Sequence, residues 1–151
     1  MPGLTAPVLL CYNVCVKEEL KMQEILDFLK KYHVFYLATV DGDQPHVRPF
    51  GVSEIYDGHL YTQTGKKKNV AQQLKKNPKA EICCFGDGKW LRIEADLVWD
   101  DRPETLKYLL DQNPNLRRMY SEDDGNCLGL RYENATATFY SFTEEPRTIK
   151  F

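Results

Sequence analysis

The sequence predicts a mainly β protein whose antiparallel strands close into a barrel that carries short helices. Short runs rich in aromatic and branched residues alternate with tight-turn signals at positions 41–42, 57–58 and 86–88, as in consecutive hairpins. Segments with helical spacing are brief and lie between these hairpins, so helices are expected at the margins of one sheet. Closure is expected because it removes exposed strand edges.

The first half of the chain is expected to hold one helix and three antiparallel strands. In residues 17–32 the apolar positions Met22, Ile25 and Leu29 recur at helical spacing among charged residues. Residues 1–16 show no clear period and are predicted to be an N-terminal extension before one domain over 17–151. Strands are predicted over 35–40, 47–52 and 59–64, with the third strand pairing beside the second.

The second half is expected to alternate helices with strand pairs. A short helix around residues 70–74 ends before Pro78, and a hairpin follows over 80–85 and 89–99. A further helix is predicted over 101–111, with Pro103 in its first turn, and the acidic segment 121–125 is expected to be a surface loop. Strands over 128–132 and 136–142 then form the last pair.

Composition limits the classes of function. The chain has 151 residues and a formal net charge of -2, so no general positive field is present to hold nucleic acid. The apolar stretch 7–11 is too short to span a membrane and lacks the flank of a signal peptide, so a cytoplasmic protein is expected. The five cysteines are expected to be free thiols, with a redox or metal pair at Cys11 and Cys15 as the alternative.

A candidate anion site combines Arg48 with the segment after the third strand. Arg48 shares a strand face with Phe50, and the strand at 59–64 leads through Gly65 into three lysines and Asn69. The amides and dipole at a helix N-terminus bind phosphate, and Asn is a favoured N-cap residue. Hydroxyls at Thr62 and Thr64 are expected to bond a polar ring or phosphate.

Simpler interpretations of the same residues stay open. Arg48 at a strand end can reach solvent or a carboxylate, and a lysine run is often only a solvated surface. The common dinucleotide and triphosphate motifs are absent, as are serine-hydrolase and zinc-protease motifs. The three histidines, His33, His46 and His59, have no metal-site spacing, so no metal is predicted and no catalytic residue is assigned.

Three segments in this order resemble the pyridoxamine 5'-phosphate oxidase-like family of FMN-binding split β-barrels. They are QPHVRPFG at 44–51, LYTQT at 60–64, and KKNV at 67–70 running on to the Asn-Pro at 77–78. The similarity runs from about residue 22 to 142 and is greatest to the nitroimidazole reductase-like branch. The C-terminal EEPRTIKF at 144–151 lacks the Arg-Leu-containing substrate motif of the vitamin B6 oxidases.

The resemblance implies a six-stranded Greek-key split barrel and a homodimer with FMN in clefts at the subunit interface. Arg48, with Lys67 or Lys68 and Asn69, would meet the FMN phosphate. Trp90 or Arg92 would approach from the other subunit. The backbone that would line the ribityl chain and isoalloxazine belongs to Pro49, Phe50 and Gly51 and to Thr62, Gln63 and Thr64.

The expected function is therefore that of a flavin-dependent oxidoreductase. A nicotinamide such as NAD(P)H or another donor would reduce the flavin, and a nitro-aromatic, a quinone or a pyridoxamine-phosphate-like molecule would be the small-molecule substrate. A noncatalytic flavin carrier or sensor is the alternative. Relatives with this barrel hold haem or deazaflavin in place of FMN, so these cofactors stay open as well.

Overall fold

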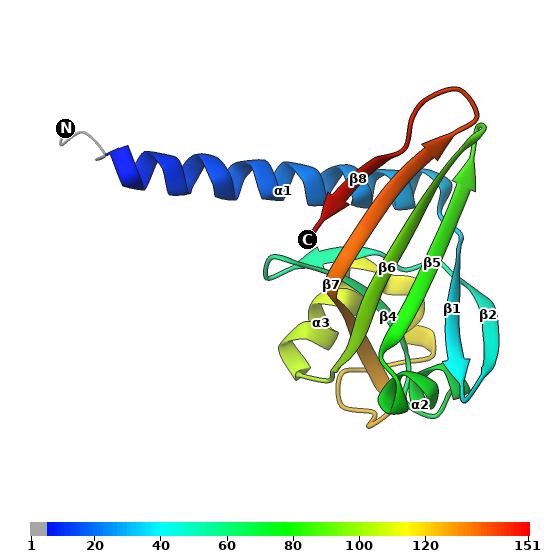
Figure 1. The fold of residues 1–151 in the computed structure, drawn as a ribbon. Helices are drawn as coiled ribbons and strands as arrows, with labels where there is room; N and C mark the ends of the chain where they lie inside the picture. Colours follow the sequence, from blue (N-terminus) through cyan, green and yellow to red (C-terminus); the bar gives the residue numbers. More distant parts are fainter. Residues whose placement is uncertain (1–5) are drawn as a thin grey trace.

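An eight-stranded antiparallel sheet dominates the computed structural model, which describes residues 6–151 (Figure 1). The hydrogen-bonded order is β2-β1-β5-β6-β7-β4-β3, with β8 paired to β7. The mainly β, antiparallel prediction is confirmed, but six strands in a closed ring is wrong, because β2 and β3 end the order without pairing to each other. The strands are β1 (Phe35–Asp41), β2 (Gln44–Phe50), β3 (Glu54–Tyr56), β4 (His59–Gly65), β5 (Lys79–Gly86), β6 (Lys89–Asp100), β7 (Cys127–Ser141) and β8 (Arg147–Lys150).

The predicted final strand pair is a single long strand, β7. It pairs with β6 from the Lys89↔Ser141 level to the Asp100↔Gly129 level. The polar residues near position 134 resemble a turn in the sequence, but the chain passes through them as an irregularity in the β6 to β7 register. Asn134 takes a positive φ of 50° there, as a bulge residue can, and the strand continues.

The third predicted strand does not pair beside the second. A short strand, β3, intervenes after β2 and forms a hairpin with β4 across the turn at 57–58. The other partner of β4 is β7, with Thr62 opposite Leu130. The sheet is therefore open between its two ends, β2 and the β3–β4 hairpin. Because β3 pairs with β4 only up to Tyr61, the rest of β4 borders this opening opposite β2.

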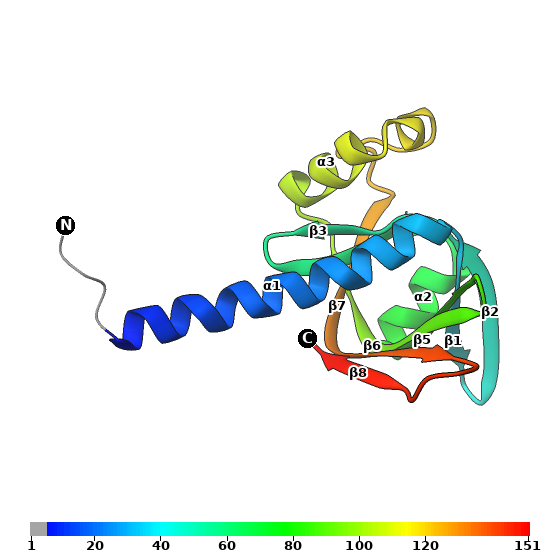
Figure 2. The ribbon, with the colours of Figure 1, turned by 90° about the horizontal axis from the view of Figure 1, so that it is seen from above.

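The first helix, α1 (Ala6–Tyr32), starts earlier than residue 17, where it was predicted. Its first half extends away from the sheet, and its second half crosses one end of it (Figures 1 and 2). Ile25 and Leu29 on that second half are fully buried in the core. The predicted extension 1–16 thus continues as helix from Ala6 onward, and its first five residues lie outside the described part. No helix among residues 6–151 has an apolar stretch long enough to cross a bilayer.

The predicted shorter helices are confirmed as α2 (Asn69–Lys76) and α3 (Pro103–Gln112), and a 3-10 helix, η1 (Pro114–Arg118), follows α3. The helix α2 covers one end of the sheet's inner face, where Val70, Ala71 and Leu74 join the core. The indole of Trp99 on β6 donates to the Ala71 carbonyl at 3.1 Å. This contact fixes α2 at the end of β6 that leads toward α3.

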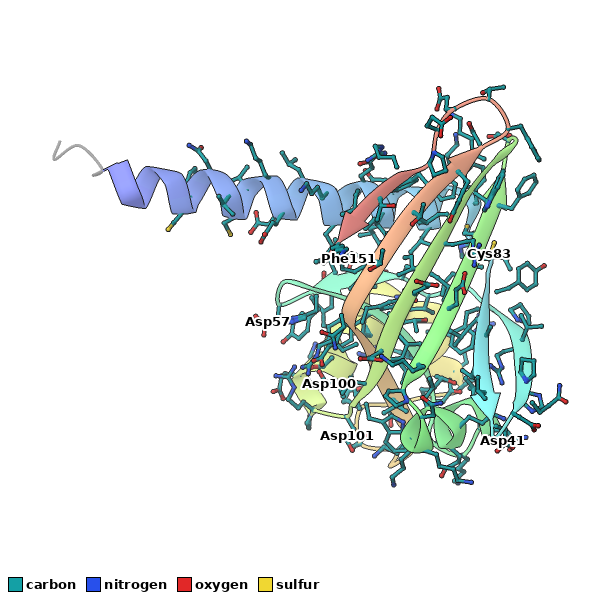
Figure 3. The ribbon with its side chains drawn as sticks, in the orientation of Figure 1. Asp41, Asp57, Cys83, Asp100, Asp101 and Phe151 are labelled. Carbon is teal, nitrogen blue, oxygen red and sulfur yellow. The ribbon has the colours of Figure 1, made fainter. Side chains whose placement is uncertain are left out.

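A buried carboxylate, Asp100, joins the end of β6 to the start of α3 (Figure 3). It accepts hydrogen bonds from the Tyr61 hydroxyl at 2.8 Å, from the Arg102 guanidinium and from Thr105. Burial alone would raise the pKa of Asp100, but the hydrogen bonds from Arg102 and Tyr61 outweigh it and hold this pKa well below its ordinary value. The ionised form of Asp100 therefore stabilises the fold.

We expect Asp100→Asn to lower the free energy of unfolding at pH 7 by about 2 kcal/mol, the scale of a lost charge-assisted hydrogen bond. Because the pKa is depressed on folding, this contribution is present above about pH 4, the unfolded value, and is lost as the pH falls below it. Urea unfolding followed by tryptophan fluorescence at pH 7 and pH 3 measures both effects. The exposed neighbour Asp101→Asn is the control and should change stability by less than about 1 kcal/mol.

Candidate functional site

The guanidinium of Arg48 lies on the inner face of the edge strand β2. It is opposite the buried Leu37 on β1, as the predicted strand face requires. It donates to Thr39 Oγ1 at 2.6 Å and to Gln73 Oε1 at 2.8 Å. No carboxylate pairs with Arg48 among the residues that the structure describes. Burial lowers the pKa of Arg48, because the charged form loses hydration there.

Gln73 is a site residue that the sequence analysis missed. It lies on α2 with 9% of its surface exposed, and its carbonyl oxygen accepts from both Thr39 and Arg48. A polar residue on the buried face of a short amphipathic helix, beside Val70 and Leu74, was the available signal. Gln73 therefore links the edge strand β2 to α2, the helix that follows β4 in the chain.

The three lysines between β4 and α2 are not equivalent. The ammonium of Lys66 is held by Asp101 at 2.7 Å and is largely neutralised. Lys67 and Lys68 make no ion pair within the described part of the chain. Of the lysine side chains that were predicted to meet an anion, those of Lys67 and Lys68 therefore stay available.

The backbone of this lysine turn is fixed by the loop that precedes β7. The amide of Lys66 donates to the carbonyl of Asn126 at 2.7 Å, and the amide of Lys67 donates to the Asn126 side chain at 3.1 Å. Asp124 in turn accepts the amides of Asn126 and Cys127, each at 2.7 Å. The acidic loop predicted over 121–125 is therefore the support of the lysine turn, a role that the sequence did not indicate.

The N-cap of α2 is Lys68, which corrects the prediction of Asn69. Lys68 has extended backbone angles and donates its amide to Gly65 at 3.1 Å, whereas Asn69 is the first helical residue. The turn from Gly65 sets this boundary, although Asn is the better capping type. The amides of Asn69 and Val70 stand in the first turn, where the helix offers no intrahelical acceptor.

Thr62 and Thr64 point into the apolar core and not toward the lysine turn. They lie opposite Leu130 and Leu128 on β7, and the exposed fractions of the two threonines are 0% and 2%. Their hydroxyls have no hydrogen-bond partner among the described residues. The intervening Gln63 is also buried and donates to the Thr64 carbonyl at 2.9 Å. The predicted contacts of these two hydroxyls to a ligand therefore stay a prediction, and the strand backbone is a further part that can line the opening.

The remaining predicted site residues divide into two groups. Pro49, Phe50 and Gly51 continue the chain from Arg48 along the edge of the sheet, and Phe50 packs on Phe35 with ring centroids 6.0 Å apart. Trp90 lies on the outer face, stacked on Tyr140 at 5.3 Å. The strand register places Arg48 level with Ile93, so Trp90 lies three strands across and three residues along from Arg48, on the opposite face of the sheet. One chain alone therefore does not bring Trp90 to Arg48.

The arrangement is suited to holding an anion at the opening of the sheet. Arg48, the side chains of Lys67 and Lys68, and the first-turn amides of α2 all donate hydrogen bonds or carry positive charge. A helix start with adjacent cations is a typical phosphate site. The side chains that contact Arg48 are an amide and a hydroxyl, so this cluster is built for binding and orientation.

The comparison with protein families agrees with this geometry. Residues 22–140 match the family described as pyridoxamine 5'-phosphate oxidase, and this match spans most of the chain. The chain belongs to this family. The pyridoxamine 5'-phosphate oxidase match begins at Met22, so the first half of α1 lies outside the matched residues.

Three relatives illustrate the range of the family. A crystal structure described as a NimC/NimA family protein from Clostridium acetobutylicum is 40% identical with a TM-score of 0.83, and the match covers 86% of this chain and 92% of that one. General stress protein 26 of Bacillus subtilis (strain 168) is 29% identical over 116 residues, which are 74% of this chain and 81% of the relative. A protein from Nostoc punctiforme PCC 73102, described as pyridoxamine 5'-phosphate oxidase-related and FMN binding, shares the fold at 15% identity, with a TM-score of 0.58 and coverage of 87% and 94%.

Proposed function

We propose that this chain binds FMN and acts as a flavin-dependent oxidoreductase on a small molecule. The observation that carries the proposal is the environment of Arg48. Its guanidinium is partly buried and has no carboxylate partner among the described residues. It donates instead to Gln73 on α2, the helix that follows the lysine turn. An arginine in such a place is stabilised by a bound anion. The phosphate of FMN, a dianion with three acceptor oxygens, matches the donors gathered there.

FMN is preferred to the other cofactors on the strength of the family. The Nostoc relative is described as FMN binding, and the chain shares its fold. Haem and deazaflavin stay as outcomes of the test, since mass analysis of the released cofactor distinguishes the three. The backbone of 49–51 and of 62–64, which flanks the opening on both sides, would line the ribityl chain and the isoalloxazine ring.

When bound, FMN supplies the electron-transfer chemistry. The chain's own part is to hold the phosphate with Arg48, Lys67 or Lys68 and the first-turn amides of α2. The buried sheet beside the opening limits the access of water. The proposed donor is NAD(P)H, and the proposed acceptors are nitro-aromatic compounds or quinones, with pyridoxamine-phosphate-like molecules as the family alternative.

We propose further that two copies of the chain form the working unit. The outer face of the sheet exposes aromatic side chains at one end, with Phe85 at 60% exposure and Phe142 at 78%. The strand register puts Tyr36 and Phe85 on the same face as Trp90. A large exposed apolar patch commonly marks a protein interface. A second copy seated on this face would bring Trp90 or Arg92 toward the partner's cofactor, which one chain alone does not do.

A noncatalytic flavin carrier or sensor is the second candidate. The observation that favours it is the chemistry of the site, because the side chains that bond Arg48 are Thr39 and Gln73 and neither is a useful acid or base. A carrier needs only the binding groups. An oxidoreductase needs in addition a place where donor and acceptor reach the ring in turn.

We expect Arg48→Ala to weaken FMN binding by about tenfold to a hundredfold, the effect of losing one charge-assisted hydrogen bond to the phosphate. The affinity for riboflavin, which lacks the phosphate, should change little. Flavin fluorescence titrations of the flavin-free protein with both ligands measure the ratio. Lys76→Ala, at the other end of α2, is the matched control and should bind FMN like the original protein. Equal FMN affinity in Arg48→Ala and the original protein would remove Arg48 from the site.

We expect the flavin-loaded protein to oxidise NAD(P)H steadily in the presence of a quinone such as menadione or of a nitro-aromatic such as nitrofurazone. Absorbance at 340 nm follows the donor, and free FMN at the same concentration is the control for the background reaction. A flavin that stays bound and passes through no more than one turnover with every donor and acceptor pair tested would support the carrier instead.

We expect the protein to sediment as a dimer and Phe85→Glu to shift it toward the monomer, because the change places a charge in the exposed aromatic face. Sedimentation equilibrium over a range of protein concentrations measures the dissociation constant. Met119→Glu, at an equally exposed apolar side chain of 67% after η1, is the control and should leave the dimer intact. A monomer at every concentration in the original protein contradicts the two-copy proposal.

A further inference from the structure

Three side chains close a ring of hydrogen bonds at the guanidinium of Arg48. Arg48 Nη1 donates to Thr39 Oγ1 at 2.6 Å, and the Thr39 hydroxyl donates to Gln73 Oε1, also at 2.6 Å. Arg48 Nη2 donates to the same oxygen of Gln73 at 2.8 Å. The ring joins β2, β1 and α2, so it sets the position of the guanidinium relative to the start of α2.

The chemistry of this ring determines which end of the Gln73 amide faces Arg48. A guanidinium donates hydrogen bonds and accepts none, and the Thr39 hydroxyl, which accepts from Arg48, has its one hydrogen left to donate. Both neighbours of Gln73 are therefore donors, and its carbonyl oxygen is the end that accepts from them. The reversed amide would leave buried donors without an acceptor. Position 73 thus requires an acceptor.

Glutamine and glutamate both supply an acceptor at this length, but they differ in charge. A carboxylate would bind the guanidinium more strongly, because the two groups form a charge-assisted pair. It would also neutralise Arg48, whose charged form is already disfavoured by burial, as its lowered pKa indicates. Glutamine accepts the same two hydrogen bonds and leaves the positive charge of Arg48 uncompensated. The residue at position 73 is therefore the one that keeps the cation free for a ligand.

The guanidinium also keeps donors that the ring does not use. Nη1 reaches the carbonyls of Leu37 at 3.3 Å and His46 at 3.4 Å, in addition to Thr39. Among the described residues, Nε makes no hydrogen bond and Nη2 makes only the one to Gln73. The N–H of Nε and the second N–H of Nη2 lie side by side along one edge of the guanidinium plane. Such a pair binds two oxygens of a phosphate at once.

We propose that Gln73 is a positioning residue that determines the specificity of the anion site. Its neutral oxygen holds Arg48 through the Nη groups and leaves the full positive charge and the Nε edge to a phosphate. The site thereby selects a phosphorylated flavin over riboflavin, which ends in a single hydroxyl. This role rests on the proposed function, because the phosphate in question is that of FMN.

The test titrates the flavin-free protein with FMN and with riboflavin and takes the ratio of the two dissociation constants from flavin fluorescence. In Gln73→Glu the preference for FMN should fall about tenfold, because Arg48 pairs with the new carboxylate and the phosphate meets a negative charge. The affinity for riboflavin should change little. Gln112→Glu makes the same charge change at the exposed end of α3 and is the control, which should keep the original ratio.

Two further measurements distinguish this role from a purely structural one. Gln73→Met removes the acceptor without adding a charge, so it should keep more of the preference for FMN than Gln73→Glu does. Thermal unfolding of flavin-free Gln73→Glu should have a midpoint equal to or above that of the original protein, since an ion pair replaces a neutral contact. A purely structural role predicts a lower midpoint and a similar loss of affinity for both flavins.

Four results overturn the proposal. They are an original protein that binds FMN and riboflavin equally, an unchanged ratio in Gln73→Glu, an equal loss of preference in Gln73→Met, and a lower unfolding midpoint in Gln73→Glu. Each of these results leaves FMN binding itself in place. An original protein that binds neither flavin contradicts the proposed function instead, so the two failures are distinguishable.

Discussion

The pairing of β6 with β7 is the constraint on which the rest of the molecule depends. These two strands run side by side over almost their full length, and every other strand is attached through one of them. On one side β5 carries β1 and β2 with Arg48, and on the other side β7 carries β4 and the lysine turn. The width of the opening between Arg48 and the start of α2 is thus set by a rigid sheet, and the Trp99 contact to Ala71 keeps the helix in place across it.

Local patterns predicted most of the elements, but not their neighbours. Turn dipeptides and apolar periods located the strands and the helices α2 and α3, because these signals act over a few residues. The pairing of β4 was missed, since the three-residue strand β3 has too little sequence to be seen. The sequence analysis divided β7 into two strands, because polar residues such as Asn134 are as typical of a turn as of a β-bulge. The face on which Thr62 lies also depends on the neighbouring strand, as both faces of β4 are buried.

The sequence analysis identified the charged residues of the candidate site, but it did not identify the neutral residues that hold them in place. Arg48 on an apolar strand face and lysines before a helix are visible in the sequence because charge in such places is unusual. Gln73 and Asn126 are neutral, and they meet the site only because the fold brings α2 and the loop before β7 to it. The distinction between Lys66 and its two neighbours likewise rests on Asp101, which is distant in sequence. Supports of this kind follow from tertiary contact and leave little local pattern.

Because the sheet is open, β2 is an edge strand. The unpaired backbone groups of an edge strand can pair with strands of other molecules, which leads to aggregation. Two of the seven residues of β2 are prolines, Pro45 and Pro49, and both are exposed. Because they are four apart in a strand that pairs with β1 on one side, their nitrogens face the same, free side, where proline offers no donor. The strand that borders the anion site thus stays open to a small ligand while it resists recruitment into intermolecular sheets.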